Sequence, residues 1–411
     1  MMATEKPAEP GEVSHATSIA QRSRIRLHFR HADMDYYLSW IVGREIYEGA
    51  DRAQCMAVAE RITDGDAESW VAQWSSLAEA VEREASAALA RGDAEAARKL
   101  FLNACTYHRA PLFLMRPTSV DFRPRAHKMR QCFRQAAGLF DPPIESIEVP
   151  FGEHRLPGYA WHPAPVAGAS QSLPTLLVLG GIETFAEDCY FMVAAEGPRR
   201  GYTVITADLP GQGFLPDEGL QFGAQMERPL SALVDYALTR PDVDCSRLAV
   251  FGFSWGGHIV FKGARYEPRL AAVIANPPMP DVFRGVLGQQ QGQDRKDPIS
   301  RLVFDQIVWR MGLRISWNPR DIAHRFGKAY DYYFHGKVDP REIDPPMLLL
   351  AGEDEAPVTL KIARETYGKL PNSASQLRIF TREEGGAAHC QIDNLGLPNG
   401  VMFDWLAEVL G

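Results

Sequence analysis

The segment GFSWGG, residues 252–257, contains a serine in the Gly-x-Ser-x-Gly pattern of a nucleophile elbow. In such an elbow the serine lies on a sharp turn between a strand and a helix, and the glycines keep the turn free of side-chain clashes. Residues 247–251 before the motif are typical of a strand, and residues 258–266 after it have the apolar spacing of a helix. Because both flanks fit, the pattern predicts Ser254 as a nucleophile.

A base for this serine is expected late in the chain. A serine hydroxyl is a weak nucleophile, so it needs a base within hydrogen-bond distance and a third group that orients the base. Around a nucleophile elbow, the order along the chain is serine, acid, histidine. His389 is the only histidine after His335, and it follows a glycine pair in the loop after the last predicted strand. We therefore predict His389 as the base.

Three consecutive carboxylates compete for the role of the acid. The acid should follow the buried strand predicted at residues 345–351, and Glu353, Asp354 and Glu355 stand directly after it. Asp354 is the preferred candidate, because an Asp followed by a short stretch to Pro-Val is the usual form of this loop. Glu355 is the main alternative, and Glu353 is a weaker one. The carboxylates that do not orient the base are expected to form a solvated acidic turn.

Acyl transfer also needs preorganised donors for the oxyanion that develops on the substrate. The backbone N–H of Trp255, at the start of the helix after the elbow, is one expected donor. The second should come from the loop after the strand predicted at 174–179, which makes Gly181 or Ile182 the candidate. Glu183 follows in the same loop, and we predict that its carboxylate binds a polar group of the substrate.

Other motifs in the chain are weak. The turn at residues 211–213 lacks the third glycine and the helix start of a dinucleotide fingerprint, and no Walker-type lysine loop is present, so no cofactor is expected. The six cysteines are scattered without the close pairs that metal sites use, so we expect buried free thiols and no metal. His258, one helical turn after the predicted nucleophile, is expected to pack under the sheet.

The elements that must position these residues divide the chain in two. Residues 24–138 have helical patterns almost throughout, whereas strands and helices alternate after the Asp-Pro-Pro break at residues 141–143. Such alternation implies right-handed crossovers and a mainly parallel sheet. A helical, aromatic-rich insertion interrupts it in the usual position of a lid. We therefore expect a disordered lead-in at 1–22, a helical N-terminal cap domain at 23–141, and an α/β catalytic domain at 142–411 with a helical lid insertion at 280–340.

The composition of the 411-residue chain is that of a globular protein, with 45% hydrophobic and 23% charged residues. The formal net charge of -8 disfavours nucleic acid and anionic membranes as partners. The first 21 residues are polar, contain two prolines and lack an apolar stretch, so they predict neither a secretory signal nor an anchor. The sequence contains no run of about eighteen apolar residues, so we expect no transmembrane helix. We expect a cytoplasmic protein that acts on a small-molecule substrate.

Four motifs carry a resemblance to a known family: LGGIET at 179–184, GFSWGG at 252–257, GEDEAPV at 352–358 and AHCQIDN at 388–394. With them, the chain from about residue 147 onward resembles an α/β hydrolase. It is similar to the group that contains 2,6-dihydropseudooxynicotine hydrolase and the fungal yellowish-green pigment hydrolases, which shorten a polyketide chain. The last motif is the most specific to this group. The extra carboxylates of the acid loop depart from the pattern of the group.

The resemblance implies a specific reaction. It implies an α/β-hydrolase fold, a homodimer, and hydrolysis of a carbon–carbon bond next to a ketone in a 1,3-dicarbonyl or aromatic polyketide-like substrate. The residues by themselves predict only serine-dependent acyl transfer, because fold and triad do not name the bond that is cleaved. Two alternatives stay open. One is a carboxylesterase, peptidase-like hydrolase or acyltransferase with the same triad, and the other is a non-hydrolytic cyclase or binding protein with the same fold.

Overall fold

The computed structural model describes residues 22–165, 172–284, 297–313 and 318–411. The lead-in predicted at 1–22 lies outside these residues except for Arg22, and two stretches of the predicted insertion, 285–296 and 314–317, also lie outside them. Within the described part of the chain, no helix is long and apolar enough to cross a membrane.

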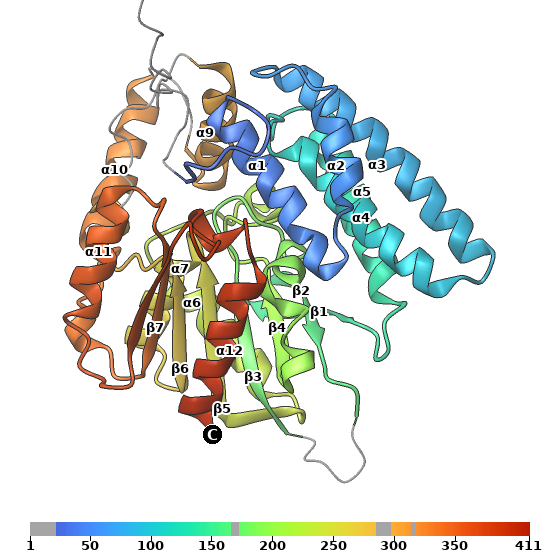
Figure 1. Ribbon diagram of the computed structural model, residues 1–411. Helices are drawn as coiled ribbons and strands as arrows, with labels where there is room; N and C mark the ends of the chain where they lie inside the picture. The colour runs from blue at the N-terminus through green and yellow to red at the C-terminus, as the bar shows by residue number, and fades with distance from the viewer. Residues whose placement is uncertain (1–21, 166–171, 285–296, 314–317) are drawn as a thin grey trace, which may run out of the picture.

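An eight-stranded sheet organises the chain from residue 145 onward (Figure 1). β1 and β2 form an antiparallel hairpin, and β2 pairs antiparallel with β4. All other strand pairs are parallel, which confirms the prediction of a mostly parallel sheet. The spatial order is β1-β2-β4-β3-β5-β6-β7-β8, and the strands are β1 (Glu145–Phe151), β2 (His154–Trp161), β3 (Leu173–Leu179), β4 (Thr203–Ala207), β5 (Val243–Phe253), β6 (Ala272–Asn276), β7 (Met347–Gly352) and β8 (Gln376–Phe380).

The two faces of the sheet pack against different helices, because successive side chains of a strand point to opposite sides. On β3, Leu177 and Leu179 belong to the apolar cluster that contains α6 and α7. Leu176 and Val178 belong to the opposite cluster, which contains α12 and the N-terminal helices. The central strands are therefore apolar on both faces, as is typical of a parallel sheet with helices on both sides. The helices of this half include α6 (Glu227–Leu238), α7 (Gly256–Tyr266), α11 (Pro357–Tyr367) and α12 (Gly396–Leu410).

The first part of the chain is helical, as its pattern predicts. The Asp66 side chain caps α3 by accepting hydrogen bonds from two backbone N–H groups, and the Asp93 side chain caps α4 by accepting one from the Ala96 N–H. Helix α2 has only eight residues, and the Asp51 side chain caps it by accepting a hydrogen bond from the Gln54 N–H. α5 ends at Ala137 and β1 begins at Glu145, so the predicted boundary falls between them. The helices are α1 (Ala32–Gly43), α2 (Arg52–Ala59), α3 (Ala67–Ala90), α4 (Ala94–Leu112) and α5 (Phe122–Ala137).

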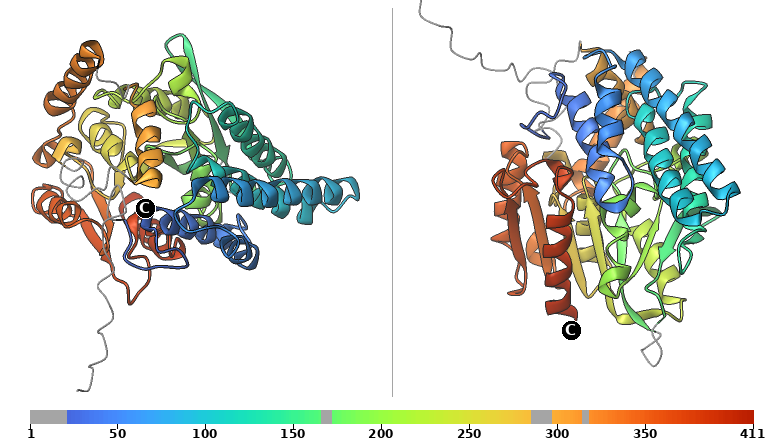
Figure 2. Two further views of the ribbon diagram at one scale, coloured as in Figure 1. Left: turned by 90° about the horizontal axis from the view of Figure 1, so that it is seen from above. Right: turned by 45° about the vertical axis from the view of Figure 1, so that its right-hand side comes forward.

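The described part of the insertion between β6 and β7 contains α9 (Pro298–Arg310) and α10 (Pro319–His335). Seen from above, α9 lies over the sheet between α10 and the N-terminal helices (Figure 2). Polar contacts join the two units: Asp297, which caps α9, lies with its Oδ2 3.0 Å from the Nε2 atom of His31. The predicted insertion and the predicted cap therefore meet above the sheet.

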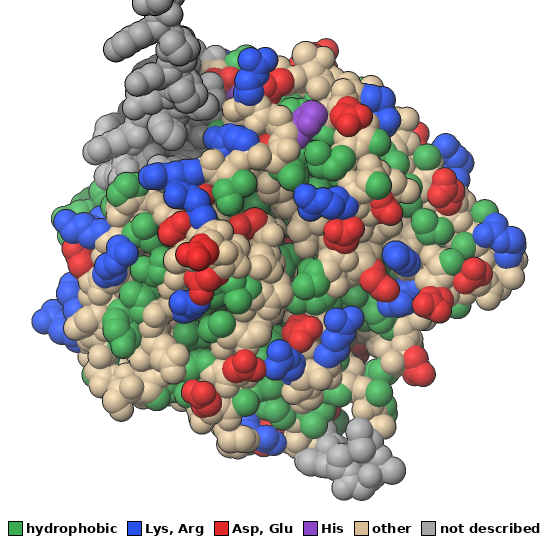
Figure 3. All heavy atoms as spheres, viewed as in Figure 1, with side chains coloured by type: hydrophobic (Ala, Val, Ile, Leu, Met, Phe, Trp, Pro, Cys, Tyr) green, Lys and Arg blue, Asp and Glu red, His purple; other side chains and the backbone are tan. Residues whose placement is uncertain are grey.

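Charged side chains of both signs are interspersed on the face of the molecule shown in Figure 3. Lysines and arginines lie beside aspartates and glutamates over the N-terminal helices and over the sheet half. On the described part of this face the two signs therefore alternate, which differs from the extended basic patch that nucleic-acid binding uses.

Candidate active site

Ser254 lies on the turn between β5 and α7. Its φ of 55° is in the left-handed region, which is a strained conformation for a residue other than glycine. The Ser254 N–H donates a hydrogen bond of 2.6 Å to the carbonyl oxygen of Asn276, at the end of the neighbouring strand β6. A side chain at Gly252 would collide with the Gly256 carbonyl group, so the glycine spacing is a steric requirement. These are the features of a nucleophile elbow.

Ser254, His389 and Glu355 form a continuous hydrogen-bonded chain. The Oγ atom of Ser254 lies 3.0 Å from Nε2 of His389, and Nδ1 of His389 lies 2.6 Å from Oε1 of Glu355. The Glu355 side chain is 1% exposed and the His389 side chain 12% exposed, so the interaction between them is shielded from water. With Nδ1 bound to a carboxylate, Nε2 is the ring atom that faces the serine.

The structure does not place Asp354 beside His389, contrary to the prediction. Asp354 is fully buried, but its carboxylate accepts a hydrogen bond of 2.6 Å from the Arg24 N–H and others from the Arg382 guanidinium. Glu355, the alternative named above, occupies the position next to the histidine. The expectation of a solvated acidic turn is wrong for Asp354, which is buried, whereas the Glu353 side chain is 33% exposed. Asp354 and Glu355 follow β7 and bind different partners, so tertiary contacts decide which carboxylate meets the ring.

The environment of His389 favours its charged form. Burial by itself lowers the pKa of the imidazole, because burial penalises the charged ring. The neighbouring Cys390 and Glu355 outweigh burial and raise this pKa well above its ordinary value. The interactions that raise the pKa also stabilise the imidazolium that forms when the ring takes up the serine proton.

The loop after β3 passes directly beside Ser254. A Cβ atom on Gly181 would lie 2.7 Å from the Ser254 Cβ, so only a glycine allows the backbone this close to the serine. The Gln212 side-chain amide fixes the loop by donating to the two carbonyl groups of residues 180–181, at 2.7 and 3.0 Å. The cavity in front of Ser254 is lined by all three residues predicted as oxyanion donors, Gly181, Ile182 and Trp255.

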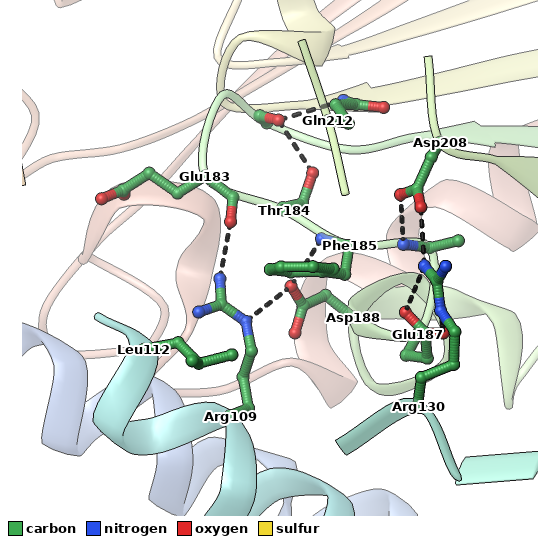
Figure 4. A network of polar contacts seen from close by, with 12 residues as sticks. Arg109, Leu112, Arg130, Glu183, Thr184, Phe185, Glu187, Asp188, Asp208 and Gln212 are labelled. Carbon is green, nitrogen blue, oxygen red and sulfur yellow. Dashed lines mark hydrogen bonds and ion pairs between the residues drawn. The ribbon is translucent and has the colours of Figure 1, made fainter. Parts of the chain in front are cut away.

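Arginine side chains of the N-terminal helices bind this loop and the segment after it (Figure 4), and an arginine of α9 binds the loop as well. Arg109 of α4 and Arg310 of α9 both donate to the Glu183 carbonyl oxygen, at 2.6 and 3.2 Å. Arg109 also pairs with the buried carboxylate of Asp188, and Arg130 of α5 pairs with two further buried carboxylates of this region. The packing of the helices above the sheet therefore determines where the loop stands relative to Ser254.

The Glu183 side chain points away from Arg109 (Figure 4) and contributes to the cavity wall. Its carboxylate accepts a hydrogen bond of 2.6 Å from the Tyr37 hydroxyl and lies 3.7 Å from Nη1 of Arg22. Glu183 is thus placed where it can meet a substrate, and its role in binding one remains a prediction.

A cavity of about 370 Å³ opens in front of Ser254. Its volume falls in the range of about 300–1,000 Å³ that is usual for small-molecule sites. The helices predicted as cap and lid supply much of its wall, which is largely aromatic and aliphatic. The apolar wall includes Tyr36 and Trp40 of α1, Phe304, Ile307 and Val308 of α9, and Tyr332 of α10. The charged lining residues are Arg22, Glu183, Arg325, Lys328, Glu355 and His389.

The residues that sequence reasoning missed come from the segment before α1 and from α1 itself. Arg22, assigned to a disordered lead-in, is 9% exposed, and its carbonyl oxygen accepts a hydrogen bond of 2.6 Å from the His389 N–H. Tyr36 lines the cavity and the Tyr37 hydroxyl binds Glu183, and nothing beyond the helical pattern of residues 24–138 marks either of them. The segment before α1 has neither an apolar period nor a motif, so no sequence signal marks it.

The remaining histidine and cysteine predictions have mixed outcomes. His258 is fully buried with Nδ1 3.1 Å from the Met279 carbonyl oxygen, and burial lowers its pKa to about 4. Five of the six cysteines are buried free thiols, but Cys245 is exposed because it lies in the polar first part of β5. Among the residues that the structure describes, one group is close enough to hold a metal ion, and it consists of Glu82, His108 and Cys132 of α3, α4 and α5.

Comparison with known proteins identifies relatives along almost the whole chain. A family model described as esterase FrsA-like matches residues 56–355. The 20-hydroxy-prefusarin hydrolase FUS2 of Gibberella moniliformis is 34% identical over 396 residues, which cover 89% of this chain and 94% of that protein. The hydrolase LUC6 of a Fusarium species is 28% identical over 401 residues, which cover 90% of this chain and 95% of that protein.

Solved structures show the same architecture. The 2,6-dihydroxy-pseudo-oxynicotine hydrolase matches with a TM-score of 0.69 at 24% sequence identity, over 90% of this chain and 95% of that one. At this identity the likeness concerns the fold. It extends over the N-terminal helices as well as the sheet, since nine-tenths of the chain is covered.

Proposed function

This chain belongs to the esterase FrsA-like family and has the α/β-hydrolase fold, and on this premise we propose that it is a serine hydrolase with the triad Ser254, His389 and Glu355. The observation that carries the proposal is the hydrogen-bonded chain from the Ser254 hydroxyl through the imidazole to the buried carboxylate, at 3.0 and 2.6 Å. It faces a cavity of small-molecule size. Nucleophile, base and orienting acid are the groups that acyl transfer requires.

In the proposed reaction, Nε2 of His389 takes the proton of Ser254 Oγ while that oxygen adds to a carbonyl carbon of the substrate. Glu355 keeps the proton on Nδ1 and stabilises the imidazolium. The backbone N–H groups of Trp255 and of the loop after β3 bind the oxyanion of the tetrahedral adduct. Collapse of the adduct breaks the bond to the leaving group, which takes the proton from His389. Water, activated by the same imidazole, then hydrolyses the acyl-enzyme.

We propose that the bond cleaved is a carbon–carbon bond next to a ketone, in a 1,3-diketone or an aromatic polyketide-like substrate. The leaving group is then a carbanion that the ketone stabilises as an enolate, and His389 protonates its carbon. The aromatic and aliphatic wall of the cavity suits such a substrate. FUS2, similar along nine-tenths of its length, is named for hydrolysis of 20-hydroxy-prefusarin, so one relative acts on a defined small molecule.

Ester hydrolysis, or acyl transfer from an ester, is the second candidate, and the description of the family as esterases favours it. The triad and the oxyanion donors perform the same steps in both reactions until the leaving group departs. An ester releases an oxygen atom that needs only a proton, whereas a diketone releases a carbon that needs charge delocalisation. The discrimination between the two therefore depends on the leaving-group side of the cavity.

A trapping experiment tests the proposal. The protein is mixed with aryl esters and with a panel of aliphatic and aryl 1,3-diketones, and intact-protein and peptide mass spectrometry then detects an acyl group on Ser254. We expect an acyl-enzyme from both classes and diketone turnover that Ser254→Ala abolishes. Ester turnover without diketone cleavage would leave only the second candidate. Full activity of Ser254→Ala would contradict serine catalysis, and no turnover of either substrate class by the unmodified protein would favour a non-hydrolytic protein.

A further inference from the structure

We infer that Arg22 is a catalytic residue on the leaving-group side of the cavity. Its guanidinium donates a hydrogen bond to the second carbonyl oxygen of a 1,3-dicarbonyl substrate and stabilises that oxygen as it becomes an enolate. The inference rests on the proposed carbon–carbon hydrolysis and names the group that would favour it over ester cleavage.

The guanidinium of Arg22 is held rigidly among side chains of α1. Its Nη2 atom donates to Oδ1 of Asp33 at 2.6 Å. Its Cζ atom lies 4.0 Å from the ring centre of Tyr36 and 4.9 Å from that of Tyr37, which is the distance of a cation–π contact. An arginine fixed in this way loses little conformational entropy when it binds a further acceptor.

The same guanidinium has donor capacity that no described residue uses. Arg22 lines the cavity, and its side chain is 10% exposed. Its Nε atom has no hydrogen-bond partner among the described residues, and Nη1 approaches Glu183 only to 3.7 Å, beyond hydrogen-bond distance. A buried donor without a partner costs free energy, about 1–3 kcal/mol. Nε is enclosed by the protein, so Nη1 is the donor that an acceptor on a substrate in the cavity would meet.

The position of Arg22 relative to His389 assigns it to the leaving group. The Arg22 carbonyl oxygen accepts a hydrogen bond from the backbone N–H of His389. The Tyr36 ring, against which the guanidinium packs, has its centre 6.3 Å from the centre of the imidazole ring. The proposed oxyanion donors are backbone N–H groups of the loop after β3 and of the start of α7, and the Arg22 guanidinium approaches that loop only at the Glu183 carboxylate, at 3.7 Å. Because His389 delivers its proton to the leaving carbon, a donor on the histidine side meets the part of the substrate that departs.

The charges around Arg22 favour a ketone oxygen over a permanent carboxylate. Asp33 and Glu183 both lie within 3.7 Å of the guanidinium. A substrate carboxylate would be a third negative group around one cation, and the two resident carboxylates would repel it. A ketone oxygen carries no net charge when the substrate binds, and it gains charge only as the carbon–carbon bond breaks. Arg22 is therefore placed to act more strongly in the transition state than in the bound state.

The step balances with groups that the chain and the substrate supply. The bond between Ser254 Oγ and the acyl carbon has already formed, and the carbon–carbon bond then breaks. Its electron pair moves to the leaving carbon and is delocalised onto the ketone oxygen that Arg22 binds. The proton on His389 Nε2 then moves to the leaving carbon, which restores a neutral ketone and a neutral imidazole for attack by water.

The test compares carbon and oxygen leaving groups on the same enzyme. For Arg22→Gln, kcat/KM on the 1,3-diketones should fall about 100-fold, the typical effect of removing one donor to a developing oxyanion. On 4-nitrophenyl esters, whose leaving group needs no enolate donor, the loss should stay below about fivefold. Arg22→Lys, which keeps the charge, should recover part of the diketone activity. Within the panel, the loss should be greatest for the ketone with the least acidic α-carbon.

A matched control separates a direct contact from the general field of the cavity. Lys328→Gln removes a positive charge from the wall of the same cavity, and it should change diketone and ester turnover by the same factor. Retained ester turnover by Arg22→Gln reports an intact fold and triad, since the backbone contact to His389 does not depend on the side chain. Equal losses on both substrate classes would overturn the role of Arg22. Failure of the unmodified enzyme on every diketone would instead overturn the proposed carbon–carbon hydrolysis, and this inference with it.

Discussion

Replacing Glu355 by Gln should reduce activity far more than replacing its neighbour Asp354 by Asn, although both carboxylates are buried. Glu355→Gln keeps the shape of the side chain but puts a neutral amide 2.6 Å from Nδ1 of His389. If the amide donates to Nδ1, the ring proton moves to Nε2, and this tautomer cannot accept the serine proton. Removing the charge of a triad acid in this way lowers kcat by about 10⁴-fold in a well-studied case, so we expect a loss of about 10³–10⁴-fold.

Asp354→Asn should act on stability instead. The Asp354 carboxylate binds the Arg24 N–H and the Arg382 guanidinium and does not contact the imidazole. Hydrogen bonds to charged groups contribute about 1.5–3 kcal/mol each, and the Arg382 side chain is 44% exposed, so water weakens its share. We expect the free energy of unfolding to fall by about 1–3 kcal/mol. The change in kcat should stay below about tenfold.

The assay measures release of 4-nitrophenolate from an aryl ester for both variants, with urea unfolding of each protein at the same temperature. The ester is the suitable substrate because it tests the triad without the leaving-group donor proposed above. The assignment of Glu355 is refuted if Asp354→Asn loses as much kcat as Glu355→Gln. It is equally refuted if Glu355→Gln, shown to be folded, stays within about tenfold of the unmodified enzyme.

On the acid side, kcat/KM should fall as the pH decreases, with a midpoint above pH 6.5. The reason is that the pKa of His389 is raised and only the neutral ring accepts the serine proton. Glu355→Gln should move that midpoint to lower pH, and an unmoved midpoint would contradict the cause given. Gly181→Ala should lower kcat at least about tenfold without unfolding, since its Cβ would lie 2.7 Å from the Ser254 Cβ. Under native conditions a maleimide should label Cys245 first, as peptide mass spectrometry can show.

The parts of the site that depend on local sequence could be predicted. The elbow follows from glycines at residues where a side chain would collide with a neighbouring carbonyl, so the motif and the turn are the same constraint. The strands before Ser254 and before the acid loop follow from short apolar runs between turn residues. His389 follows from chain order and from being the only late histidine. Each of these inferences needs only a few consecutive residues.

The parts that depend on contacts between distant segments could not be predicted. Asp354 was preferred over Glu355 because local pattern cannot tell which of two adjacent carboxylates faces the histidine. The choice depends on Arg24, 330 positions earlier in the chain, and on Arg382, both of which bind Asp354. Arg22 was missed for the same reason, because an arginine in a polar segment has no periodicity that reveals burial against α1.

The two neighbouring carboxylates position different parts of the site. Glu355 binds the imidazole of His389, and Asp354 binds the backbone of Arg24. That second contact fixes the segment in which the Arg22 carbonyl group holds the His389 N–H and the Arg22 side chain reaches the cavity. The same turn after β7 therefore positions the base and, through the N-terminal segment, the proposed leaving-group donor. A change at Asp354 should accordingly affect diketone cleavage more than ester cleavage, because it loosens the support of Arg22 while leaving the Glu355 contact in place.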